Sequence, residues 1–145
     1  MNKFKNFVFR PQRSGIRKAL GKLEAEIMEL IWQRPVGEGI SVRDIYEILH
    51  TRRSLAYTTV MTTMSRLAKK GLLSIEKVNQ TYIYRALLTK KEFTDSLVGW
   101  LLDSLFLDLS GAALSYFLSS ADAADREELE RILREVERQR REGKV

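Results

Sequence analysis

The sequence predicts a mainly α-helical protein with one small β-hairpin, and two observations carry this prediction. Apolar residues recur at three- and four-residue spacing in several segments, the pattern of helices that bury one face. In residues 72–87, two short runs of strand-favouring side chains are separated by a turn. The apolar and charged contents, 44% and 30%, are typical of a globular chain with its own core.

The first two helices are predicted by apolar stripes with clear ends. Over residues 20–33, leucine and isoleucine recur on one face, and Pro35 with the two glycines after it ends the helix. A second helix is expected over residues 42–50, because Ser41 is a favourable N-cap and apolar positions recur behind it. Two consecutive amphipathic helices are therefore expected.

The third helix, expected over residues 56–70, has an unusual polar side. Val60, Met64 and Leu67 form its core-facing stripe, but the segment also holds four threonines within six residues. Such β-branched residues disfavour helix formation. Their short hydroxyl and methyl groups would suit close contact with base edges in a DNA major groove. An ordinary surface helix, held in place by packing, is the other interpretation.

The two strands of the hairpin are expected at Leu72–Val78 and Thr81–Leu87, joined by Asn79 and Gln80. Gly71 would end the preceding helix. Three helices followed by such a hairpin describe a winged helix-turn-helix, in which the third helix enters the major groove and the wing lies along the backbone. We therefore predict this domain over residues 20–88.

Residues 89–145 are predicted to form about three helices that make up a dimerisation domain. Thr89 and Glu92 have the spacing of a capping box, and a break is expected near Leu109–Gly111. So short a segment cannot bury its own apolar stripes, so pairing with a second copy is favoured over an intrachain core. The predicted dimerisation residues are Phe93, Leu97, Trp100, Leu101, Leu105, Leu114 and Phe117.

Charge is distributed unevenly along the chain. Residues 1–90 hold 17 basic and 7 acidic residues, a balance of +10, whereas residues 91–145 hold 8 and 12, a balance of −4, for a total of +6. This asymmetry indicates that the first part meets a polyanion and the second part has another role. Residues 1–19 contain no acidic residue, and we expect a flexible basic arm that either follows phosphates or only improves solubility.

Composition excludes several kinds of site. The chain has no cysteine, which excludes a disulfide framework, a thiolate metal site and a cysteine nucleophile, and it has only one histidine. One histidine and no cysteine disfavour a metal site, and a metal-responsive repressor with Asp, Glu or His ligands is the weaker alternative. We expect no enzyme or cofactor, because no base or nucleophile accompanies the few neighbouring carboxylates. These are Glu24 with Glu26, and Asp122 with Asp125, all expected on solvated helix faces.

One apolar stretch, residues 96–118, is long enough to cross a bilayer. Asp103 and Asp108 lie near its middle, and each would cost about 2.5–3.5 kcal/mol at the centre of a membrane. The stretch is therefore expected to be a protein interface with no membrane partner. Together with the lack of cysteine, this favours a cytoplasmic protein.

In their order and spacing, four segments resemble the penicillinase-repressor (BlaI/MecI/CopY) family: LGKLEAEIMELIW, VRDIYEIL, LAYTTVMTTMSRLAKKGLL and YIYRALLTKKEF. The resemblance covers roughly residues 20–118. It implies a dimeric winged-helix repressor that binds inverted-repeat operators, often of the TACA/TGTA type. Paired threonines on the family's recognition helix correspond to Thr59 and Thr62, so the resemblance implies base contact there.

Other residues near these threonines are expected to contact phosphates. Arg53 precedes the third helix, and Lys77 and Arg85 are the cations nearest the tip of the wing. With them, the predicted phosphate contacts are Tyr57, Thr58, Arg66 and Lys69.

The sequence also departs from parts of the family. The copper-responsive branch ends in a cysteine cluster, which is missing here, so copper sensing of that type is excluded. Repressors of the β-lactam branch are cut at an Asn–Phe bond, and the corresponding bond here is Tyr116–Phe117. The resemblance thus implies a regulatory protease as a further partner. The residues themselves leave two other modes of release from DNA open, a ligand in the helical domain or a partner protein. The alternative function is a protein-interaction module that uses a winged helix without specific DNA binding.

Overall fold

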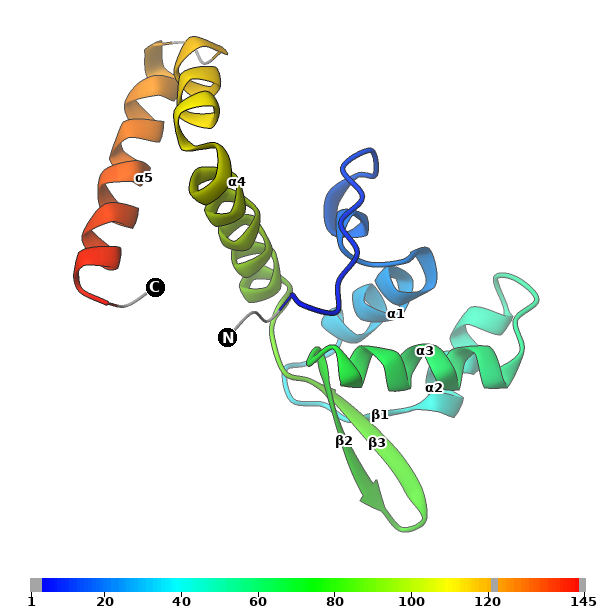
Figure 1. The fold of residues 1–145 in the computed structure, drawn as a ribbon. Helices are drawn as coiled ribbons and strands as arrows, with labels where there is room; N and C mark the ends of the chain where they lie inside the picture. Colours follow the sequence, from blue (N-terminus) through cyan, green and yellow to red (C-terminus); the bar gives the residue numbers. More distant parts are fainter. Residues whose placement is uncertain (1–3, 121–122, 144–145) are drawn as a thin grey trace. The chain divides into compact units, whose positions relative to one another are not determined.

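The computed structural model describes residues 4–120 and 123–143, and the chain divides into two units at Val98 (Figure 1). In the first unit the elements are η1 (Gly15–Lys18), α1 (Lys22–Trp32), β1 (Ile40–Ser41), α2 (Val42–His50), α3 (Tyr57–Lys69), β2 (Leu73–Val78) and β3 (Thr81–Ala86). Helix α4 (Lys90–Ser120) begins in the first unit and continues into the second, which also contains α5 (Ala123–Arg141).

The first unit is a winged helix-turn-helix, as predicted. Helices α1, α2 and α3 enclose an apolar core, and the β2–β3 hairpin projects from them as the wing (Figure 1). The sheet has a third strand that the sequence does not predict, because β1 is only two residues long. Its Ile40 pairs antiparallel with Tyr84, which gives the strand order β1-β3-β2. Both of these side chains are buried, so β1 ties the helices to the wing.

Local backbone chemistry ends α3 and turns the wing. Gly71 has a φ of +82°, and the N–H groups of Gly71 and Leu72 donate to the carbonyls of Ala68 and Leu67. This is the Schellman arrangement, which requires a left-handed residue after the helix. At the wing tip Asn79 and Gln80 both have positive φ, 48° and 69°, as a two-residue type I′ turn requires.

Two helices begin with the caps that the sequence predicts. Ser41 Oγ accepts a hydrogen bond of 3.1 Å from the Asp44 N–H, and the Asp44 carboxylate accepts one of 3.0 Å from the Ser41 N–H. At the start of α4, Thr89 and Glu92 exchange the same pair of bonds, 3.1 and 2.8 Å long. These reciprocal bonds satisfy N–H groups that have no partner within the helix.

The prediction of a flexible N-terminal arm is wrong for the described residues 4–19. Phe4 is only 5% exposed, and the Phe4 and Phe7 rings lie 6.2 and 6.1 Å from the ring of Phe93. Trp32 completes this aromatic cluster at 5.7 Å from Phe93. Burial of large aromatic surface outweighs the entropy of a free arm. The basic residues between the aromatic ones hid this apolar pattern in the sequence.

Two of the predicted dimerisation residues are also reassigned. Phe93 and Leu97, in the first turns of α4, are 0% and 4% exposed within the single chain. They belong to the core of the first unit, which leaves them almost no surface for contact with a second copy. For the same reason the first unit extends to Val98, ten residues beyond the predicted domain boundary.

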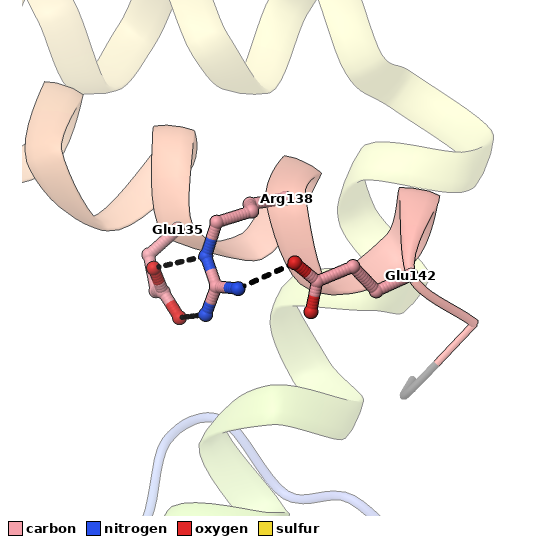
Figure 2. Close-up of polar contacts among 3 residues, drawn as sticks. All are labelled: Glu135, Arg138 and Glu142. Atoms are coloured by element: carbon pink, nitrogen blue, oxygen red, sulfur yellow. Dashed lines mark hydrogen bonds and ion pairs between the residues drawn. The ribbon is translucent and has the colours of Figure 1, made fainter.

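The second unit contains the later part of α4 and helix α5. Leu109 has non-helical angles, φ −132° and ψ 34°, which confirms the break expected near Leu109–Gly111. Along α5, Arg138 donates to Glu135 and Glu142 (Figure 2), and these hydrogen bonds raise its pKa. Exposed ion pairs contribute little stability, so this is an ordinary solvated face. Over the described residues, no helix combines the length and apolarity needed to cross a membrane.

Candidate DNA-binding interface

Helix α3 has one buried side and one exposed side. Val60, Met64 and Leu67 are fully buried, as predicted. Thr63 joins this buried side, at 6% exposure, and its hydroxyl donates a 2.8 Å hydrogen bond to the carbonyl of Thr59. This bond satisfies the polar group inside the core. One of the four threonines is therefore structural, whereas the other three remain at the surface.

The exposed side of α3 brings together five predicted DNA-binding residues. In the described part of the chain, their side chains make no hydrogen bond or ion pair with other residues, and all five are exposed. They are Thr58, Thr59, Thr62, Arg66 and Lys69. Because these hydroxyl and cationic groups have no partner among the described residues, they are available to bind another molecule.

Two grooves flank this exposed side. The first, which we call the α1 groove, has a volume of about 480 Å³ and separates α3 from the start of α1. It is lined by Gly21, Lys22, Leu23, Glu24, Thr58, Thr59, Thr62, Thr63 and Arg66. The basic residue Lys22 at its rim is a candidate phosphate contact that the sequence analysis missed, because its proximity to α3 arises only from folding.

The second groove, the wing groove, has a volume of about 470 Å³ and lies between α3, the start of α2 and the hairpin. It is lined by Ser41, Val42, Arg43, Tyr57, Met61, Ser65, Ile75, Gln80, Thr81, Tyr82 and Tyr84. Arg43 is a second cation that the sequence analysis missed. Hydroxyl groups and an arginine along a groove beside α3 suit contact with a DNA backbone.

Three predicted cations stand apart from the α3 cluster. Arg53 pairs with Glu26 at 3.0 Å, and Arg85 pairs across the hairpin with Glu76 at 2.6 Å. Lys77 is exposed on the wing, with its ammonium 5.8 Å from the centre of the Tyr82 ring. Because carboxylates already neutralise the two arginines, we expect them to contribute less to phosphate binding than Lys77.

The expected solvated position of Glu24 is wrong. Its side chain is 8% exposed, and its carboxylate lies 2.8 Å from the ammonium of Lys70, at the C-terminal end of α3. One oxygen also accepts the Gly21 N–H at 2.9 Å. The Glu24–Lys70 pair therefore fixes the start of α1 against the end of α3. Glu26 is half-buried and paired with Arg53, whereas the side chains of Asp122 and Asp125 lie outside the described residues.

The remaining predicted dimerisation residues lie in the second unit. Leu105 is exposed, and Trp100 and Leu101 are half-buried. The side chains of Leu114 and Phe117 are outside the part that the structure describes. Further apolar side chains of the second unit are also exposed, including Leu107, Leu109, Tyr116 and Ile132.

The described residues contain no group of three or more His, Asp or Glu side chains that could hold a metal ion.

Three helices, a hairpin wing and an exposed polar third helix define the class of winged helix-turn-helix proteins. Within this class the chain belongs to the penicillinase repressor family, whose model matches residues 20–135. This match confirms the resemblance seen in the sequence. The family is one of transcriptional repressors and not of enzymes.

Two curated relatives are proteins named transcriptional regulator BlaI, from the CDC 1551 / Oshkosh and H37Rv strains of Mycobacterium tuberculosis. Each is 37% identical to this chain over 122 residues, which covers 81% of this chain and 85% of the relative. An uncharacterized 16.5 kDa protein in the ptsI 3′ region of Latilactobacillus sakei is 31% identical over 88 residues. That match covers 61% of this chain and 56% of the relative.

Proposed function

We propose that this chain is a cytoplasmic repressor that binds DNA sequence-specifically, as a homodimer, at inverted-repeat operators. One observation carries the proposal: the exposed side of α3 presents threonine hydroxyls and two cations that have no partner in the described part of the chain. Grooves on both sides of this helix provide space and further cations for the two backbones of a DNA duplex. Membership of a repressor family supports the same function.

The residues divide into two roles in this proposal. Thr59 and Thr62 contact base edges, because their short side chains allow α3 to approach the floor of the major groove. Cations and hydroxyls around them contact phosphates and set the position of the helix. The proposed phosphate contacts are Tyr57, Thr58, Arg66, Lys69 and Lys77, with smaller contributions from Arg53 and Arg85.

Fluorescence anisotropy with the DNA upstream of the protein's own gene, against a scrambled duplex in a salt series, tests the proposal. We expect at least about a hundredfold preference for the upstream duplex and a steep loss of affinity with salt. If the protein does not prefer the upstream duplex, selection from random duplexes should identify its preferred site. Failure of both experiments to show a preferred sequence would contradict specific DNA binding.

The two roles predict different effects on DNA binding for two substitutions on the same helix face. Thr62→Ala should relax base preference at one position per half-site, where a wrong base normally costs about 1–3 kcal/mol. Lys69→Ala should weaken binding to all sequences about equally and lower the salt slope by about 1. Titrations of both variants against the preferred duplex and its single-base changes provide the measurement. Equal effects on all duplexes from both variants would contradict this division.

The dimer is supported by the exposed apolar side chains of the second unit, such as Leu105 and Leu107, since such surface usually marks a protein interface. Light scattering at micromolar concentration should give the mass of two chains. Leu107→Ser, at a side chain 73% exposed, should shift this mass toward that of one chain without unfolding the protein. A mass equal to one chain for the unmodified protein would contradict the dimer.

For release from DNA, the proposal includes cleavage at Tyr116–Phe117 by a regulatory protease. Tyr116 is 69% exposed, which supports access to this bond. The bond lies within the helical part of α4, so cleavage requires the helix to open locally.

A further inference from the structure

The wing groove has an apolar part on a face otherwise suited to DNA. Four apolar or aromatic side chains that line it are unusually exposed: Tyr57 at 43%, Met61 at 42%, Ile75 at 45% and Tyr82 at 54%. Neighbouring exposed apolar side chains mark a contact surface more often than isolated ones do. On a protein face that binds DNA, such a surface would meet an apolar group of the duplex.

Met61 is the member of this set placed to meet a base. It lies on the exposed side of α3, three residues after Thr58 and four before Ser65, so these side chains are neighbours along the helix. In the sequence it directly precedes Thr62, a proposed base contact. Ile75 and Tyr82 instead come from the wing, which follows the DNA backbone in this class of protein.

The two flanks of α3 differ in chemistry. Toward the α1 groove the helix presents Thr59 and Arg66, which suit hydrogen-bonding groups and phosphates. Toward the wing groove it presents Tyr57, Met61 and Ser65. Of these, Met61 alone has no hydrogen-bond donor and is only a weak acceptor. In the major groove the 5-methyl group of thymine is the one apolar group that distinguishes a base.

We propose that Met61 contacts the 5-methyl group of a thymine and so sets a preference for thymine at one position of each half-site. This inference rests on the proposed DNA-binding function and adds a specificity-determining residue to it. Methionine suits the role, because its unbranched and polarisable side chain adapts to the shape of the methyl group. Contact with a deoxyribose would bury the same side chain without any base preference, and the test separates these cases.

The experiment replaces each thymine of the preferred duplex, one at a time, by deoxyuridine, which removes only the methyl group. With the unmodified protein, one thymine per half-site should show about fourfold weaker binding, the value expected for one buried methyl group. With Met61→Ala, the thymine and deoxyuridine duplexes should bind equally well at that position. Lys69→Ala is the matched control, because it should weaken both duplexes by the same factor and keep the fourfold ratio.

Met61 is exposed on the helix, so Met61→Ala should fold normally, and an unchanged midpoint of thermal unfolding verifies this. Specific binding without sensitivity to any thymine methyl group would overturn the role of Met61 alone. The same conclusion would follow if Met61→Ala kept the full sensitivity. If no duplex were preferred over a scrambled one, the proposed function itself would fail, so the two failures are distinct.

Discussion

Phe93→Ala is expected to lower the free energy of unfolding of the first unit by about 3–5 kcal/mol, the usual cost of removing a buried aromatic ring. Phe93 is fully buried, and its ring contacts those of Phe4, Phe7 and Trp32. Alanine would leave a cavity between α4, α1 and the N-terminal segment, which carry these four rings. The N-terminal segment would lose much of the apolar surface that holds it in place.

Urea unfolding followed by circular dichroism, at one fixed protein concentration, measures this loss. Val98→Ala is the control, because Val98 lies in the same helix but is 48% exposed, and its substitution should change stability little. If Phe93 served a dimer interface instead, Phe93→Ala would alter the mass in solution and leave the stability of the first unit nearly unchanged. That result would contradict its assignment to the core.

Lys70→Met is expected to cost a similar amount, about 3–5 kcal/mol, because it leaves a buried carboxylate without its counter-charge. The side chains of Lys70 and Glu24 are only 12% and 8% exposed, and they meet at 2.8 Å. The Lys70 ammonium also lies 5.1 Å from the centre of the Phe7 ring, a cation–π distance that the substitution would lose. Since Glu24 lines the α1 groove, its uncompensated charge should also weaken DNA binding.

Urea unfolding also tests this second prediction, with Lys69→Met as the matched control. Lys69 is the exposed neighbour of Lys70, so its substitution should leave stability nearly unchanged. The double variant with Glu24→Gln and Lys70→Met should recover most of the loss. It removes the unpaired charge, while the glutamine oxygen still accepts the Gly21 N–H. A double variant no more stable than Lys70→Met would show that the charge is not the cause.

Features that depend on residues close together in the chain could be predicted from the sequence alone. The Ser41–Asp44 and Thr89–Glu92 caps, the end of α3 at Gly71 and the apolar stripe of α3 all arise from side chains within one or a few helical turns. Local hydrogen bonds and helical periodicity decide such features, so pattern reasoning can recover them. The winged-helix order and the polar threonine side of α3 followed from them.

The partner that covers each helix face depends on segments far apart in the sequence, and it became known from the folded structure. Phe93 fits an apolar stripe equally well in a dimer interface or in its own core, and the choice depends on Phe4 and Phe7, far away in the sequence. The Glu24–Lys70 pair joins residues 46 positions apart, and the place of Met61 in a groove depends on the wing. Periodicity shows that a face is apolar or polar, but burial depends on the packing of distant segments, which no local pattern records.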